Sequence, residues 1–295
     1  MSNRTSLTAA IAGAAVAIGG LASGARAQAV TYLRFEEGTA GNTVTATGAA
    51  TPGAVVDSAG GDDNFATFAA ANAPTYTATV PFPTVPLTGT ANTLALDFPG
   101  GRDVFSPDIA GPLRTTDFND FTIEAFYRPD VLPAFATIVG RDDNGNPGEA
   151  AGGRALVYFS SRGANLAFEA ADSTGTYSTA VTTNAPLVIG NWHHIAVVGS
   201  SATDTATLYL NGVQVAQTPF TDGLFDPTAN TAWTVGRGQF NGNPADFVDG
   251  QIDEVRWTAA ALTPAQFLNI PEPASAGLLA LGAIGLLARR SCRRR

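Results

Sequence analysis

Lysine is missing from this 295-residue chain, so all 16 of its basic residues are arginines. Against them stand 25 aspartates and glutamates, and the formal net charge is −9. An acidic surface of this kind repels the phosphates of nucleic acids and of anionic lipids. We therefore expect no nucleic-acid partner.

Cysteine and histidine are almost as scarce. The only cysteine is Cys292, near the C-terminus, so the rest of the chain has neither a disulfide nor a thiol nucleophile. The only histidines, His193 and His194, are neighbours and point to opposite faces of a strand. They cannot bind one metal ion together, a three-histidine zinc site is excluded, and we expect each to pack or to hydrogen-bond. No serine lies in a nucleophile-elbow pattern.

Long uncharged apolar runs occur only at the two ends of the chain. At the N-terminus, Arg4 precedes a modestly apolar stretch that finishes in small residues. This pattern is typical of a secretory signal peptide, residues 1–27, with Ala25 and Ala27 at the cleavage site and cutting after Ala27. Ala29 marks a second possible site, and a lasting N-terminal anchor is the alternative.

At the C-terminus, Pro271-Glu272-Pro273 precedes an uncharged run over residues 274–288. As a helix this run spans about 22 Å, short of the roughly 30 Å hydrocarbon core of a bilayer. Arg289, Arg290 and residues 293–295 can extend its reach into the headgroups, and their cluster places this end in the cytoplasm. We predict a short transmembrane helix in the precursor rather than a buried core helix, because the run is apolar on all sides.

These three parts in this order resemble the PEP-CTERM sorting signal of diderm bacteria. In that family a membrane-embedded enzyme, exosortase, cuts near the Pro-Glu-Pro and releases or transfers the protein. The resemblance implies exosortase as a partner for residues 271–295. It also implies export across the inner membrane, transient anchoring there, and final placement at the cell surface or outside the cell.

Loss of both ends would make the remaining chain more acidic. Seven of the 16 arginines lie in the predicted removable ends, while all 25 acidic residues lie between residues 28 and 273. The mature charge is then −16. A disulfide-free domain over residues 28–270 must be held together by its core alone, which a single large all-β domain can supply.

Between residues 28 and 260 the sequence shows short alternating runs rich in Val, Ile, Phe, Tyr and Thr, with almost no helical periodicity. Asn211-Gly212 predicts a type I′ hairpin turn, and a second hairpin is expected to turn over residues 162–165. Thr263 and Pro264 favour a short helix after the last strand. Residues 38–92 are expected to form long loops around a few edge strands. We predict an antiparallel β-sandwich.

Five segments also resemble the laminin-G-like domains of the concanavalin A-like lectin/glucanase superfamily. They are YLRFEEG, NTLALDFPGGRDVF, FTIEAFYRPD, GNWHHIAVV with ATLYLNGVQVA, and GQIDEVRWTAAALTPAQF, together spanning residues 32–268. The resemblance implies a jelly-roll sandwich, a fold that serves sugar binding, adhesion, catalysis or packing alone.

Catalysis on this fold would require two carboxylates about 5 Å apart for a retaining glycosidase. Glu124 has Thr122 and Phe126 at the alternating positions of its own strand, and Asp253 and Glu254 are adjacent and so expected on opposite faces. We therefore expect no enzyme, although a carboxylate pair drawn from different strands stays open.

Calcium is the cofactor that the Asp- and Asn-rich chain fits best. The segment 141–150 does not fit an EF-hand loop, because Pro147 stands where the loop needs its glycine and Gly153 where it needs its glutamate. If the opening strand lies beside the closing one, Glu36 with Asp249 or Asp253 would supply the ligands. The alternative for these three residues is hydrogen bonding at turns and strand edges.

The leading functional hypothesis is a non-enzymatic surface or matrix protein that binds an extracellular polysaccharide or a surface protein. A purely structural coat protein and a polysaccharide-active enzyme are the alternatives. If sugar is bound, Trp192, Trp233 and Trp257 are the candidate stacking residues, and core packing is the competing role for each.

Overall fold

A computed structural model of the protein describes residues 27–48, 53–108, 110–142, 153–171, 176–182, 186–221, 223–224 and 231–269. The predicted signal peptide, except Ala27, and the whole segment from 270 onward lie outside these residues. Among the described residues there is no helix long and apolar enough to cross a membrane.

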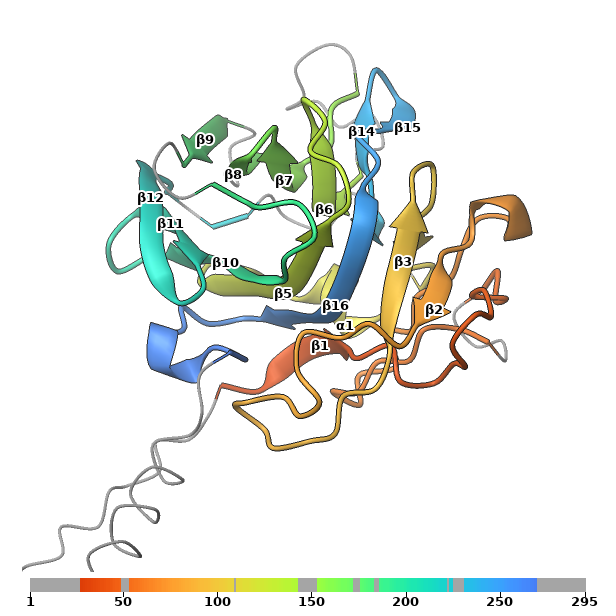
Figure 1. The fold of residues 1–295 in the computed structure, drawn as a ribbon. Helices are drawn as coiled ribbons and strands as arrows, with labels where there is room; N and C mark the ends of the chain where they lie inside the picture. The colour runs from red at the N-terminus through yellow and green to blue at the C-terminus, as the bar shows by residue number, and fades with distance from the viewer. Residues whose placement is uncertain are drawn as a thin grey trace, which may run out of the picture.

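Two antiparallel sheets form the molecule (Figure 1). The eight-stranded sheet has the order β12-β11-β10-β5-β16-β3-β2, and β1 also pairs with β16. Its strands are β1 (Ala29–Leu33), β2 (Thr75–Thr77), β3 (Ala95–Pro99), β5 (Phe121–Pro129), β10 (His193–Ser200), β11 (Thr205–Leu210), β12 (Val213–Pro219) and β16 (Asp249–Thr258).

The six-stranded sheet has the order β4-β13-β6-β7-β8-β9. Its strands are β4 (Val104–Phe105), β6 (Ala136–Arg141), β7 (Val157–Arg162), β8 (Asn165–Ala171), β9 (Tyr177–Val181) and β13 (Trp233–Val235). A separate hairpin joins β14 (Gly238–Phe240) to β15 (Asn243–Ala245). The expected antiparallel β-sandwich is thus confirmed.

Both predicted hairpins are present. Asn211 and Gly212 connect β11 to β12 with φ angles of 53° and 80°, the two positive values that a type I′ turn requires. The turn between β7 and β8 includes Gly163, also with positive φ. The expected final helix is the short 3-10 helix η3 (Pro264–Gln266), where the Gln266 Oε1 atom accepts hydrogen bonds from the backbone and hydroxyl of Thr263.

The core lies between the two sheets and follows from the alternation of side chains along the strands. On β5, the side chains of Phe121, Ile123, Ala125 and Tyr127 enter the common core, as the sequence predicts. Residues 38–92 supply mostly loops, with η1 (Ala70–Asn72) and the edge strand β2. A second short helix, α1 (Pro112–Thr115), precedes β5.

The long strand β16 organises the eight-stranded sheet. One of its edges pairs with β5, and its other edge pairs with β3 at one end and with β1 at the other. The opening strand therefore does lie beside the closing one (Figure 1). A β-bulge between Asp253 and Arg256 lies where the neighbour changes from β3 to β1, and Glu254 there has a φ angle of 51°.

Candidate functional site

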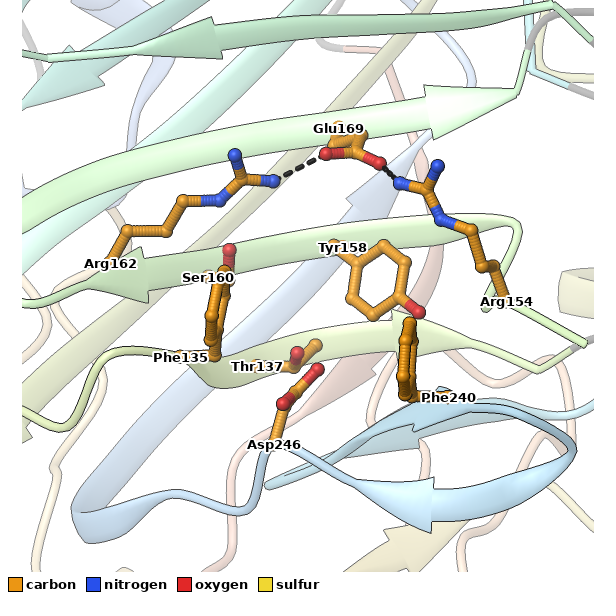
Figure 2. A pocket seen from close by; sticks show the side chains of 9 residues that line it. All are labelled: Phe135, Thr137, Arg154, Tyr158, Ser160, Arg162, Glu169, Phe240 and Asp246. Atoms are coloured by element: carbon orange, nitrogen blue, oxygen red, sulfur yellow. Dashed lines mark hydrogen bonds and ion pairs between the residues drawn. The ribbon is translucent and has the colours of Figure 1, made fainter. Parts of the chain in front are cut away.

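A pocket of about 410 Å³ lies on the outer face of the six-stranded sheet. Strands β6, β7 and β8 form its floor, and the β14–β15 hairpin forms one side (Figure 2). This volume falls within the range of small-molecule sites. The lining residues are Phe135, Thr137, Arg154, Tyr158, Ser160, Arg162, Glu169, Phe240 and Asp246.

Two phenylalanine rings form opposite walls of the pocket. Phe135 precedes β6 and Phe240 ends β14, and their side chains are 55% and 52% exposed. Figure 2 shows the rings on either side, with Thr137 and Asp246 between them. Large apolar side chains so exposed at the mouth of a hollow are typical of a binding surface.

Charged groups cross the floor of the pocket. The Arg154 and Arg162 guanidinium groups reach the Glu169 carboxylate from opposite sides, one to each oxygen (Figure 2). Glu169 has only 8% of its side chain exposed, while the arginines are 32% and 28% exposed. Glu169 is thus fixed, and each arginine keeps exposed surface toward solvent.

Asp246 is the second carboxyl group of the pocket, and it balances the charge of the lining. Burial raises the pKa of Asp246, and the positive charge of Arg162 opposes that rise. Burial, followed by the charge of Arg154, lowers the pKa of Arg162. With two arginines and two carboxyl groups, the formal charge of the lining is zero.

A second hollow, of about 460 Å³, is lined by residues from 37–45 and 53–56 and by Tyr76. Its walls are mostly threonine, glycine and alanine, and its one aromatic side chain, Tyr76, is 4% exposed. The Tyr76 hydroxyl donates to Glu37 at 2.9 Å. This hollow has polar groups but no exposed ring, so the first pocket is the better candidate site.

Two of the three residues predicted to bind calcium, Glu36 and Asp253, are engaged in other contacts. Glu36 accepts hydrogen bonds from the Thr93 backbone at 2.7 Å and from its hydroxyl. Asp253 is fully buried and accepts from the Asn92 side chain at 2.8 Å, while Asp249 lies four residues away along β16. Among the residues that the structure describes, no three His, Cys, Asp or Glu side chains form a metal-sized group. Calcium binding by this set stays a prediction.

The expectation that Asp253 and Glu254 face opposite ways is wrong, because the bulge interrupts the alternation. Both side chains lie on the outer face, where Glu254 pairs with Arg34 at 3.2 Å and accepts from the Tyr32 hydroxyl. Burial and the adjacent charge of Glu254 raise the pKa of Asp253 well above its ordinary value. The pair is enclosed by the protein and does not reach the pocket.

The tryptophans do not form a sugar platform. Trp233 and Trp257 have no exposed surface and pack against each other edge to face, with ring centroids 5.9 Å apart. Trp192 is partly buried against a small cluster on the other sheet. Phe135 and Phe240, the exposed phenylalanine rings of the first pocket, carry no distinguishing pattern in the sequence.

Models of known protein families match most of the chain. The family model described as the concanavalin A-like lectin/glucanases superfamily matches residues 101–267, more than half of the protein. The PEP-CTERM protein-sorting motif matches residues 269–295. Among curated proteins, none matches the chain.

Several solved structures are similar. A candidate carbohydrate binding protein from Bacteroides ovatus is 22% identical, over 52% of this chain and 41% of its own, with a TM-score of 0.40. The CBM40 of the Ruminococcus gnavus IT-sialidase, bound to α2,3-sialyllactose, is 14% identical, over 53% of this chain and 83% of its own, with a TM-score of 0.42. The botulinum neurotoxin serotype G binding domain is 14% identical, over 80% of this chain and 49% of its own, with a TM-score of 0.45. The chain thus spans less than half of the first and third of these proteins.

Proposed function

Because the chain belongs to the concanavalin A-like lectin/glucanase superfamily and carries a PEP-CTERM sorting motif, we propose that it is an exported glycan-binding protein of the cell surface or matrix. The sorting motif implies export and exosortase processing. The bound ligand is an extracellular polysaccharide, and the binding site is the pocket between Phe135 and Phe240.

The pair of exposed rings is the observation that carries this proposal. The apolar face of a pyranose ring stacks on an aromatic side chain, and two rings on opposite walls offer such a surface at each side. Between them, Ser160, Glu169 and the two arginines supply donors and acceptors for sugar hydroxyls. An apolar pocket with a few convergent polar groups is the usual form of a small-ligand site.

The charge of the pocket favours a neutral sugar. The negative charge of Glu169 offsets one of the two arginine charges, and the carboxyl group of Asp246 offsets the other. An acidic sugar would add a negative charge to a neutral pocket on a strongly acidic domain, which electrostatic repulsion disfavours. We therefore propose neutral polysaccharides as the ligand.

Binding without catalysis follows from the same contacts. Each oxygen of Glu169 is held by a guanidinium group, so neither is free to act as a nucleophile or to exchange a proton with a glycosidic oxygen. With Glu169 engaged, Asp246 is the one remaining carboxyl group of the lining, whereas hydrolysis requires two.

The test is a screen of the secreted protein against neutral and acidic polysaccharides, with calcium and with a chelator, followed by calorimetry on the best ligand. Phe240→Ala is expected to weaken binding by about 1.5 kcal/mol, roughly tenfold in Kd, because one stacking wall is lost. The matched control is Phe68→Ala, since Phe68 is 54% exposed but stacks on Phe105 away from the pocket.

Different results would overturn different parts. Uniform failure to bind any polysaccharide would favour a purely structural coat protein. Equal losses of affinity in Phe240→Ala and Phe68→Ala would show that the polysaccharide does not bind in this pocket. Release of reducing sugar, abolished by Glu169→Gln, would establish an enzyme.

A further inference from the structure

The chain that follows β16 folds back across the outer face of the eight-stranded sheet, on the side of the sandwich opposite the pocket. Thr122 on β5 begins the attachment: its hydroxyl donates to the Ala260 carbonyl at 2.7 Å and accepts from the Leu262 backbone at 3.0 Å. The segment 260–268 therefore lies along the sheet rather than leaving it directly.

Glu124 holds the far end of this segment. Its Oε2 atom accepts from the Leu268 backbone N–H at 2.9 Å and lies 2.8 Å from the Nε2 atom of His194. Its Oε1 atom accepts from Arg256, whose guanidinium group also donates to the Gln266 carbonyl at 2.9 Å. One buried carboxylate thus joins three strands to the chain end.

Apolar packing closes the same segment. The Phe267 ring lies 5.5 Å from the ring of His194 and 5.1 Å from that of Tyr209, measured between centroids. Leu268 packs in a small cluster on this outer face, and its carbonyl accepts from the Leu87 backbone at 3.1 Å. Neither Phe267 nor Leu268 has any exposed surface.

These contacts exist only when the domain has folded. Glu124, His194 and Arg256 come from β5, β10 and β16. Along the chain, Glu124 is 70 residues from His194, 132 from Arg256 and 144 from Leu268. Burial acts to raise the pKa of Glu124, but Arg256 and His194 hold it below its ordinary value. The carboxylate therefore stays charged inside the protein.

We propose that Glu124, His194 and Arg256 form a clamp that fixes the point where the sorting signal leaves the fold. The PEP-CTERM motif begins at residue 269, directly after the clamped Leu268. Pro271 is three residues farther on, so it stays within about 11 Å of the clamp. Without the clamp, Thr122 still holds Leu262, and the same proline reaches about 32 Å from that point.

The position of the clamp sets the direction in which the processing enzyme meets the domain. Ala27, the first described residue, packs in the same cluster as Leu262 and Phe267. Both ends of the domain thus lie together on the outer face of the eight-stranded sheet. The processing enzyme approaches this face, while the pocket points the opposite way. The clamp also keeps Phe267 and Leu268 buried, which protects the bonds beside them from other proteases and favours cutting within the sorting signal.

The test is brief chymotrypsin digestion of the full chain in detergent, with cut sites assigned by mass spectrometry. In the wild type we expect no cut after Phe267 while sites beyond residue 269 are cut. Glu124→Gln is expected to raise cutting after Phe267 at least tenfold. A carboxylate accepts at both ends, whereas an amide accepts at one, so Gln cannot satisfy Arg256 and the Leu268 N–H together.

Two further variants make the outcome decisive. Asp103→Asn is the matched control, because Asp103 pairs with the buried Arg237 at 2.8 Å in the other half of the sandwich; it is expected to leave cutting after Phe267 unchanged. If Glu124→Gln does not fold, Leu268→Ala removes the apolar packing that holds the same segment, with little effect on the main core, and is also expected to raise cutting after Phe267. Wild-type cutting after Phe267 as fast as in the tail, or equal increases in all variants, would overturn the proposal.

Discussion

Among the described residues, the carboxylates of Asp63, Glu124, Asp253 and Glu254 have no exposed surface, and they are not all stabilised in the same way. Glu124 and Glu254 have arginine partners, and Asp253 has an amide partner and a raised pKa. None of these arrangements is evident from sequence. Alternation along β5 predicts which side chains face outward, but it cannot show that the chain end returns to cover that face.

Asp63 gives a prediction at this scale. It accepts from the Thr31 hydroxyl and the Leu113 backbone, yet burial raises its pKa to about 6. A carboxyl group with a raised folded-state pKa stabilises the fold fully below its unfolded pKa of about 3.9, and this contribution is lost as the pH rises through 6. Urea unfolding of the wild type should lose stability over this window relative to Asp63→Asn. Parallel pH profiles for the two proteins would contradict the assignment.

At the scale of elements, the sequence predicts the hairpin turn between β11 and β12 but not the β-bulge in β16. Asn211-Gly212 predicted the β11–β12 hairpin because few dipeptides accept two positive φ angles. The bulge in β16 escaped prediction because Glu254, a residue that rarely adopts positive φ, occupies that conformation. Its stability there comes from Arg34 and Tyr32, which are distant in sequence.

The hairpin itself can be tested through Gly212. Its φ angle of 80° is costly for any residue with a Cβ atom. Gly212→Ala should lower the free energy of unfolding by about 1–2 kcal/mol, measured by urea denaturation. Gln214→Ala, at an exposed position of the following strand, serves as the control and should change little. Unchanged stability in Gly212→Ala would mean that the turn relaxes to another type.

At the scale of the whole molecule, the sequence predicted the sandwich but not its pocket. The order of strand-like segments resembles a known family, whereas the pocket depends on how the β14–β15 hairpin lies beside β6 to form one side of it. That arrangement is set by tertiary packing. Phe135 and Phe240 lie at the ends of strands, where alternation does not determine exposure.

Processing supplies the prediction at this scale. Mass spectrometry of the exported protein should show a chain that begins at residue 28 and ends near Pro271-Glu272-Pro273. It should lack Cys292, Arg289 and Arg290, because the sorting motif is removed with its arginine cluster. An intact C-terminus on the secreted form would refute this prediction, and deletion of residues 271–295 is the matched control for release without sorting.

The position of β16 also bears on the order in which the chain folds. This strand is the partner of β1, β3 and β5, yet it is the last to emerge during synthesis. A chain that stops before Asp249 leaves β1 unpaired and β3 apart from β5, so the eight-stranded sheet cannot assemble. Such late, non-local pairing makes folding slow. The eight-stranded sheet therefore stays unassembled until β16 is made, which favours export of the chain before it folds.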